Sequence, residues 1–298
     1  MTLKQTIKRI YEEKYKVLLM FSLLLLVLAF VQIGVQTALT GDFVHRGITL
    51  KGGSTITLEN TELNPEDLQS YLHQEFPSAE INVRTIYAAG KVVALAVDSD
   101  AQDNAEINLI LNALNKKVDL KGAKPSVEVM GAALGSSFFK QAGIALIISF
   151  ILMALVVLLY FRLWIPSLAV IACAFSDIVV TMAIFNLTGI KLSTAGVAGF
   201  LMLIGYSIDT DILLTTRVLK RHEGTVMERI YSSISTGMTM TVTTICVVLV
   251  ALIFVQSETI RQILVIVLIG MFVDMIMTWI QNVAFLRLYL EKKKPNLK

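Results

Sequence analysis

The sequence contains few charged residues and few residues that would interrupt a helix. Of its 298 residues, 16% are charged and 5 are proline, whereas 55% are hydrophobic. Because soluble domains carry about a quarter charged residues, this composition indicates a membrane protein. The 2 cysteines, Cys173 and Cys246, lie inside apolar runs without a CxxC or zinc-type spacing, so neither a disulfide nor a structural metal is expected.

Motifs of known catalytic chemistry are also absent from the sequence. It has no Ser/His/Asp arrangement, no HExxH pair and no glycine-rich phosphate loop. Its three histidines, His45, His73 and His222, are far apart along the chain. These absences argue against the common enzyme classes, and we expect neither an enzyme nor a bound cofactor or metal ion.

Six apolar runs are long enough to cross a bilayer, whose hydrocarbon core needs roughly 20 residues of helix. The predicted spans are residues 17–35, 142–161, 164–187, 192–214, 238–255 and 263–285. The predicted division is an amino-terminal segment (1–16), a first span (17–35), a polar domain (36–135), a five-helix membrane domain (136–290) and a tail (291–298).

Lys and Arg are distributed unevenly among the segments that join the spans. One group of segments holds Lys4, Lys8, Arg9, Lys14, Lys16, Arg217, Lys220, Arg221, Arg229, Arg287 and Lys292 to Lys294. The opposite short loops hold only Lys191 and Arg261. Because cytoplasmic loops carry an excess of Lys and Arg, we expect a multi-pass protein of the cytoplasmic membrane with both termini cytoplasmic and the polar domain outside.

The polar domain shows strand and helix periods in a fixed order. Strand-like segments occur at 47–59, 81–88, 91–98 and 125–130, with a turn at Ala89-Gly90. One helix begins at Asn64-Pro65, and a second has Ile107, Ile110, Leu111 and Leu114 on one face. The order β-α-β-β-α-β predicts a ferredoxin-like α+β domain, with two helices on one sheet face and the other face free for a partner or the membrane.

Three of the predicted spans carry acidic residues at depths where lipid surrounds a helix. Asp177 and Asp274 lie near the middle of the third and sixth spans, and Asp209 and Asp211 lie in the cytoplasmic half of the fourth. An ionised carboxylate in hydrocarbon is unstable by at least a few kcal/mol. Each of these side chains must therefore face protein or water, or carry a proton.

Two explanations of these acids stay open at this point. They can be structural, forming hydrogen bonds between spans. Proton or cation handling is favoured, because three spans carry acids and no intramembrane Lys or Arg neutralises them. Asp209 and Asp211 point roughly 200° apart on a regular helix. Both can face one seam only if the helix is locally unwound, which Gly199 and Gly205 would permit.

The fifth span has a row of hydroxyl side chains. Thr in a membrane helix often donates to a carbonyl of its own helix, and this explanation is favoured for most of the row. Thr241 and Thr244 are nevertheless candidates, with the acids, for a path that passes protons through trapped water. Gly237 interrupts the row and would let a neighbouring helix approach closely.

Several motifs together resemble the SecF family, the smaller half of the SecD/SecF protein-export pair in the resistance-nodulation-division superfamily. The motifs are RGITLKGGS (46–54), VMGAALGSSFFKQAG (129–143), Phe-Arg (161–162), IGYSIDTD (204–211) and LIGMFVDMIMTWIQN (268–282). The family-motif residues are Gly52, Gly53, Gly205, Tyr206, Ser207 and Arg217. Bacterial SecF proteins have their acid at the position of Thr210, whereas Asp209 matches the acid of SecD and Asp274 resembles archaeal forms.

The resemblance implies an accessory subunit of the Sec protein-export machinery. Its implied partners are a SecD-like subunit, a SecYEG-type channel, the exported polypeptide and membrane lipid, with no nucleic acid. An ion gradient would act through Asp177, Asp209, Asp211 and Asp274. Two alternatives remain: a small-molecule or lipid exporter of the same superfamily, against which six spans and one outside domain argue, and an assembly factor whose Asp residues only hold helices together.

Overall fold

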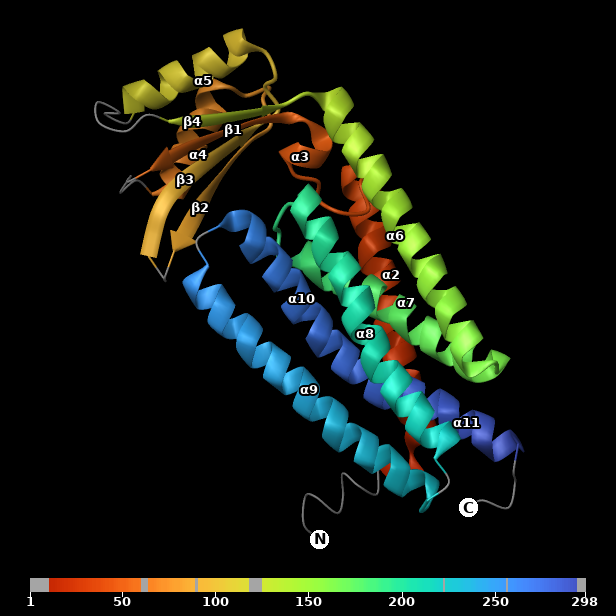
Figure 1. The fold of residues 1–298 in the computed structure, drawn as a ribbon. Coiled ribbons are helices and arrows are strands. Elements are labelled where there is room, and N and C mark those ends of the chain that lie inside the picture. Colours follow the sequence, from red (N-terminus) through yellow and green to blue (C-terminus); the bar gives the residue numbers. More distant parts are fainter. Residues whose placement is uncertain are drawn as a thin grey trace.

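The structure, a computed structural model, describes residues 11–59, 64–88, 91–117, 125–221, 223–255 and 257–293. The predicted turn at Ala89-Gly90, His222 and the basic residues Lys4, Lys8, Arg9 and Lys294 lie outside these ranges. Six long apolar helices and one α+β domain make up the described part of the chain (Figure 1). The predicted fold class is therefore confirmed.

Most of the apolar helices are longer than the apolar runs that define them in the sequence, and one, Trp164–Leu187, has the predicted bounds. They are α2 (Tyr15–Thr40), α6 (Ala132–Phe161), α7 (Trp164–Leu187), α8 (Thr194–Lys220), α9 (Val226–Phe254) and α10 (Glu258–Ile276), which continues as the π-helical segment η1 (Met277–Asn282) and α11 (Val283–Lys293). Helix α9 begins with polar turns because Thr225 and Glu228 form a capping box, each side chain accepting from the other's backbone N–H.

The helices differ strongly in how much of their surface the protein covers. Helices α7, α8 and α10 are the most buried, whereas α2, α6 and α9 expose most of their side chains. Helix α10 packs against α7, α8 and α9, and α2 packs against α7 and η1. Polar side chains that must avoid lipid are therefore best accommodated between α7, α8 and α10.

The ferredoxin-like domain contains one antiparallel sheet. Its strands are β1 (Gly53–Glu59), β2 (Ile81–Ala88), β3 (Lys91–Ser99) and β4 (Ser126–Met130), in the order β2-β3-β1-β4. Helices α4 (Pro65–Glu75) and α5 (Asn104–Lys117) cover one face, where Leu72 and Leu114 pack on Ile56 and Val97. Helix α5 lies on the far side of the sheet from the helical bundle (Figure 1).

The opposite face of the sheet carries polar side chains. Thr55 Oγ1 donates a hydrogen bond of 2.7 Å to Asp98 Oδ1, and Arg84 Nε donates one of 2.8 Å to Asp98 Oδ2. Asp98 is buried, so both of its carboxylate oxygens have donors. This is the sheet face that was predicted to lie free of the two helices.

The segment 47–59 is not a single strand, and that prediction is wrong for residues 47–52. Ile48–Lys51 form one helical turn (α3), and β1 starts only at Gly53. Gly52 and Gly53 have φ of 95° and 134°, and a Cβ on Gly53 would lie 2.3 Å from the Ser99 carbonyl oxygen. The two glycines therefore mark a close approach of the backbone at a sharp change of direction rather than a bulge within a strand.

The segment between α2 and β1 is fixed on the corner between α7 and α8. Gly47 N donates to the Leu192 carbonyl at 2.7 Å, and Leu192 N donates to the His45 carbonyl at 2.6 Å. Val44 and Leu50 are fully buried in the cluster that contains Phe185 and Phe200. Gly53, the first residue of β1, pairs with Met130 of the neighbouring strand β4, and Met130 lies one residue before the N-cap of α6. Both connections to the bundle therefore lie at one corner of the sheet.

Replacing Gly53 with alanine is expected to destabilise the ferredoxin-like domain by about 1–3 kcal/mol, because φ is strained there for an L residue and the Cβ meets Ser99. Gly143→Ala in α6 is the matched control, since no atom of the described residues would lie within 4 Å of its Cβ. It should be neutral or slightly stabilising. Thermal unfolding and limited proteolysis in detergent measure both variants, and equal stability of the two would contradict this description of the corner.

Candidate functional site

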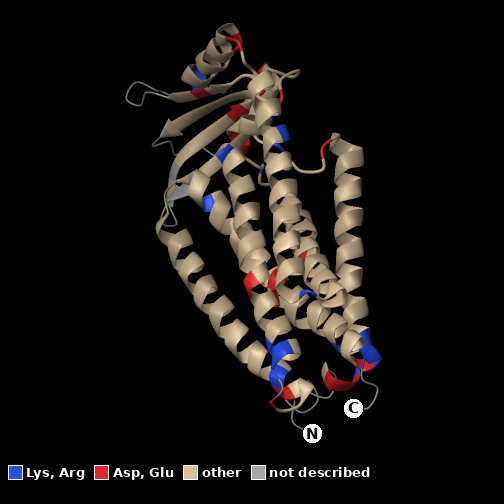
Figure 2. Cartoon of the chain, turned by 45° about the vertical axis from the view of Figure 1, so that its right-hand side comes forward, with Lys and Arg blue, Asp and Glu red and all other residues tan. Residues whose placement is uncertain are grey.

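Three of the four predicted acids lie together in the interior of the helical bundle. Asp177 comes from α7, Asp211 from α8 and Asp274 from α10, and their exposed fractions are 0%, 0% and 5%. Figure 2 shows acidic residues part-way along the bundle, whereas most Lys and Arg lie towards its ends. The three most buried helices therefore meet at these residues, which we call the carboxylate cluster.

Hydroxyl groups donate to two of the three carboxylates. Ser207 Oγ donates to Asp177 Oδ2, and Thr278 Oγ1 donates to Asp274 Oδ1 at 3.0 Å. Thr210 Oγ1 lies 3.2 Å from Asp274 Oδ2 and 2.9 Å from the Ser207 carbonyl oxygen. A hydroxyl has only one proton to donate, so Thr210 cannot satisfy both acceptors at once.

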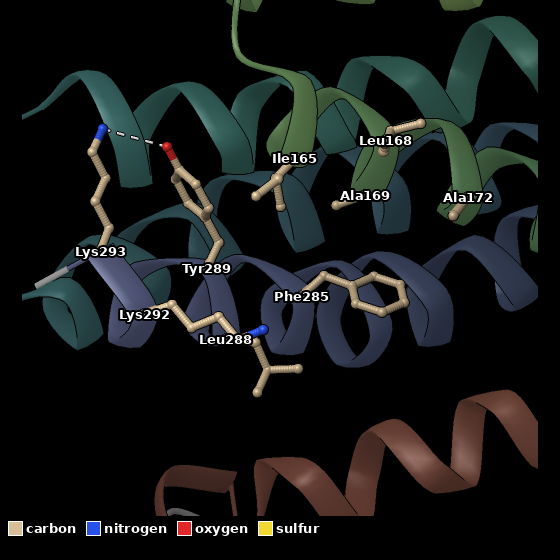
Figure 3. A pocket seen from close by; sticks show the side chains of 9 residues that line it. All are labelled: Ile165, Leu168, Ala169, Ala172, Phe285, Leu288, Tyr289, Lys292 and Lys293. Atoms are coloured by element: carbon tan, nitrogen blue, oxygen red, sulfur yellow. Dashed lines mark hydrogen bonds between the residues drawn. The ribbon is translucent and has the colours of Figure 1, made fainter. Parts of the chain in front are cut away.

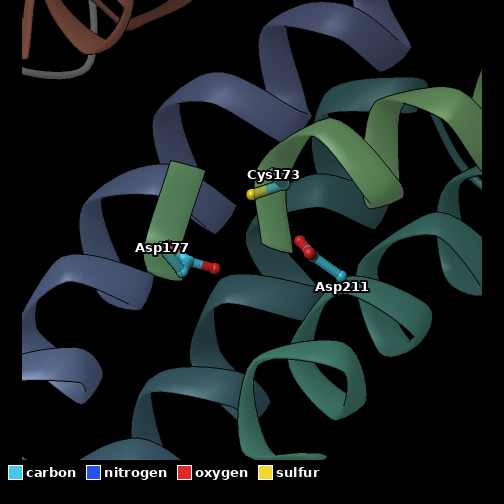
Figure 4. A group of neighbouring side chains, drawn as sticks. All are labelled: Cys173, Asp177 and Asp211. Atoms are coloured by element: carbon cyan, nitrogen blue, oxygen red, sulfur yellow. The ribbon is translucent and has the colours of Figure 1, made fainter. Parts of the chain in front are cut away.

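The third carboxylate shares its surroundings with the first. Asn282 Nδ2 donates to Asp211 Oδ1 at 2.7 Å. Cys173 Sγ and carboxylate oxygens of Asp177 and Asp211 all lie within 4.8 Å of one another (Figure 4). These three atoms are potential ligands for a cation. Among the described residues, the second oxygens of Asp177 and Asp211 are buried without a hydrogen-bond partner.

The segment η1 supplies polar side chains that are not among the predicted site residues. Thr278, Gln281 and Asn282 are all buried, and Gln281 Nε2 donates to Ser176 Oγ at 3.0 Å. These residues follow Asp274 at i+4, i+7 and i+8, which places them on one helix face. Their periodicity within an apolar run was the signal that could have identified them. Single π-helical turns are frequent at functional sites.

The amino-terminal segment contacts η1 from the end of the bundle. Tyr11 Oη donates to the Trp279 carbonyl at 2.7 Å, and Arg287 donates to the carbonyl groups of Tyr11 and Glu12 at 3.2 and 2.9 Å. Burial, together with the neighbouring Tyr231, raises the pKa of Tyr11 above its ordinary value. The hydroxyl therefore remains a hydrogen-bond donor throughout the physiological pH range, and it holds a carbonyl of the π-helical segment.

Asp209 does not belong to the carboxylate cluster. Helix α8 is continuous from Thr194 to Lys220, so Asp209 and Asp211 point in different directions, and Asp209 is exposed. It lines a cavity of about 60 Å³ together with Asp274, Thr241, Thr244 and other residues of α8, α9 and α10. Such a volume holds a few water molecules. Asp274 is thus the acid that belongs to both the cluster and the cavity.

The hydroxyl row of α9 has mainly local hydrogen bonds. Thr239, Thr243 and Thr244 each donate to the carbonyl four residues earlier, at 2.7 to 3.1 Å. Thr241 is buried and faces the cavity with Thr244. A Cβ on Gly237 would lie 2.3 Å from the Trp279 ring, so this glycine permits close contact between α9 and η1.

The family-motif residues occupy three different places. Ser207 is buried beside Asp177, whereas Gly205 and Tyr206 are exposed on the side of α8 that carries Asp209. Arg217 lies near the end of α8 and donates to the Ser232 carbonyl at 2.8 Å and to Thr236 Oγ1 at 2.9 Å. It therefore links α8 to α9. Gly52 and Gly53 form the corner between α3 and β1.

Comparison with known proteins gives matches over nearly the whole chain. Residues 110–292 match the family model described as protein export membrane protein SecD/SecF, C-terminal. The chain is 36% identical to the protein-export membrane protein SecF of Pyrococcus furiosus over 292 residues, which are 98% of this chain and 97% of that protein. It is 33% identical to SecF of Methanocaldococcus jannaschii over 288 residues, which are 93% and 96% of the two chains.

A solved structure has the same fold. The crystal structure of SecDF from Thermus thermophilus, described as a translocon-associated membrane protein, superposes with a TM-score of 0.73 at 20% identity. The superposition covers 93% of this chain and 38% of that chain. The SecDF chain is therefore much longer than the region it shares with this protein.

The six apolar helices and the ferredoxin-like domain define a multi-pass membrane protein of a transport class rather than an enzyme. The chain belongs to the SecD/SecF family of protein-export membrane proteins and is of the SecF type.

Replacing Tyr11 with phenylalanine removes the hydroxyl that donates to Trp279 and keeps the ring. The loss of one partly buried hydrogen bond is expected to lower the free energy of unfolding by about 1 kcal/mol. Tyr160→Phe is the matched control, because among the described residues its hydroxyl makes only a 3.5 Å contact with Thr216. Thermal unfolding in detergent compares the two, and an unchanged melting temperature for Tyr11→Phe would show that this contact does not hold η1.

Replacing Asn282 with leucine is expected to destabilise the bundle by about 1–3 kcal/mol, since Asp211 then loses the donor to a buried oxygen. The matched control is Thr243→Val on the exposed face of α9, which removes only a hydrogen bond within its own helix. The same unfolding assay measures both. If Asp211→Asn fails to restore stability to the Asn282→Leu variant, the charge of Asp211 is not the cause of the loss.

Proposed function

We propose that the protein is an accessory subunit of the Sec machinery that uses an ion gradient to assist the export of polypeptides across the cytoplasmic membrane. In this proposal it pairs with a SecD-like subunit beside a SecYEG-type channel. Both termini are cytoplasmic and the ferredoxin-like domain is outside, as the bias of Lys and Arg between the two sets of loops supports.

The observation that carries the proposal is a shortage of hydrogen-bond donors in the carboxylate cluster. In the described part of the chain, no Lys or Arg pairs with Asp177, Asp211 or Asp274. Within the described ranges, the buried oxygens without a hydrogen-bond partner include Asp177 Oδ1 and Asp211 Oδ2 in the cluster and Gln281 Oε1 and Asn282 Oδ1 in η1. A buried group of acceptors is stable only when protons or a cation supply the missing positive charge.

The cavity beside Asp274 supports a route for that ion. Asp209 is exposed and Asp274 is buried, both residues line the cavity, and Asp274 also belongs to the cluster. A proton that enters from Asp209 through a few waters can therefore reach Asp274 without crossing lipid. One proton moving down ~150 mV releases about 3.5 kcal/mol. This is sufficient to shift a two-state equilibrium by a few hundredfold.

The exposure of Asp209 also supports a partner in the membrane. Gly205, Tyr206 and Asp209 share the uncovered side of α8. At this depth an ionised Asp209 facing lipid would be destabilised by at least a few kcal/mol. A second protein with a polar surface would cover it, and a SecD-like subunit is the partner that the family membership favours.

Asp274→Asn is expected to abolish most of the export activity while leaving assembly intact. The amide keeps the shape of the side chain and can still accept from Thr278, but it cannot take up or release a proton. Loss of a proton-transfer group typically lowers a rate by ~10²-fold or more. The measurement is the rate at which a secreted reporter appears outside cells that contain only the variant, with and without a collapsed ion gradient.

Glu106→Gln, an exposed acid on α5, is the matched control and should export normally. Co-purification of a SecD-like subunit in mild detergent reports assembly in the same cells. Normal export by Asp274→Asn would rule out an ion relay through this residue. Loss of export together with loss of co-purification would instead favour the assembly-factor alternative.

A further inference from the structure

A second hollow lies at one end of the bundle, between the beginning of α7 and α11. It has a volume of about 560 Å³ and is lined by Ile165, Leu168, Ala169, Ala172, Phe285, Leu288, Tyr289, Lys292 and Lys293. Figure 3 shows the apolar side chains along the two helices, with both lysines towards one end. We call this hollow the α7–α11 groove. It lies apart from the cavity that Asp209 and Asp274 line.

The charged side chains that line the groove are all positive. Its nine lining residues include two lysines and no acid. Glu291, the acid of α11, accepts a hydrogen bond of 2.6 Å from Tyr15 Oη and so contacts α2 instead. Lys293 lies 5.7 Å from the centroid of the Tyr289 ring, which places its ammonium group beside the groove. An occupant must therefore be apolar along most of its length and anionic at one end.

The groove also lies at the depth where a membrane surface is expected. Helix α7 begins at Trp164 and α11 ends at Lys293, so the charged end of the groove coincides with the ends of two apolar helices. Trp164 is 75% exposed there, and Tyr289 lines the groove. Trp and Tyr are enriched at the boundary between headgroups and hydrocarbon. From this boundary the groove runs along α7 as far as Ala172.

We propose that the α7–α11 groove binds an anionic membrane lipid. Its phosphate group lies beside Lys292 and Lys293, and one hydrocarbon chain lies along Leu168, Ala172 and Phe285. Basic pockets between membrane helices bind anionic headgroups through this combination of charge and apolar surface. A helix of a partner protein would need its own acid at the level of the lysines, whereas a lipid carries the negative charge at the membrane surface.

The site borders the segment of α7 that leads into the carboxylate cluster. The Ala172 carbonyl accepts a hydrogen bond of 2.8 Å from Ser176 Oγ and a longer one of 3.4 Å from Gln281 Nε2. Cys173 and Asp177 follow on the same helix. A lipid chain against Ala172 therefore supports the packing of α7 on η1. The proposed binding does not require the ion coupling proposed above and is tested separately from it.

Native mass spectrometry of the purified, delipidated full chain tests this site. Phosphatidylglycerol and phosphatidylcholine with identical chains are the two probes. We expect phosphatidylglycerol to bind at least about tenfold more tightly than phosphatidylcholine. The double variant Lys292→Gln/Lys293→Gln should remove that preference, because its affinity for phosphatidylglycerol falls by roughly ten- to thirtyfold. The matched control is Lys116→Gln/Lys117→Gln, a lysine pair at the end of α5, which should bind as the unchanged protein does.

A second variant tests the apolar part of the groove. Leu168 is 56% exposed, so Leu168→Gln is expected to fold normally and to weaken binding of both lipids. Equal binding of the two lipids by the unchanged protein would overturn the proposal. Identical lipid binding by the two lysine double variants would also overturn it. Release of the bound phosphatidylglycerol when a SecD-like subunit associates would overturn it as well and would identify a protein helix as the occupant.

Discussion

A carboxylate in the interior of a membrane protein needs donors, protons or a cation, and this requirement organises the helical bundle. Asp177, Asp211 and Asp274 sit where α7, α8 and α10 bury one another, and their partners come from Ser207, Thr210, Thr278 and Asn282. The π-helical segment η1 places two of these donors. Tyr11 in turn holds η1 from the end of the bundle, so the surroundings of the cluster extend to the amino-terminal segment.

Much of the fold was predictable because it follows from period and length. Apolar runs define the six spans, and the alternation of strands and helices with Asn64-Pro65 as a helix start defines the ferredoxin-like domain. Residues 47–52 were misread because GITLK alternates as a strand does. The helical turn there depends on contacts of His45 and Gly47 with Leu192, which are far away in the sequence.

The candidate site was predictable only in part. The four acids were found because a charge in an apolar run is conspicuous, and the angle between Asp209 and Asp211 followed from helix geometry. The donors were missed because Gln281 and Asn282 are uncharged amides within an apolar run. Their spacing from Asp274 indicates a shared helix face, but it does not predict the π-helical turn in which they lie. The separate cavity beside Asp209 depends on how α9 approaches α8 and α10, which only the packing of the helices determines.

The attachment of the sheet at a single corner has a mechanical consequence. Strands β1 and β4 are neighbours, and Gly53 of β1 pairs with Met130 of β4. The chain enters β1 from α3 and leaves β4 into α6, so both connections to the bundle lie beside this pair. A rigid body joined along one short edge behaves as a lever. Sliding of α6 by a fraction of a helical turn would therefore swing the strand ends that lie far from this corner through a larger arc, while the hydrogen-bonded ladder inside the sheet stays unchanged.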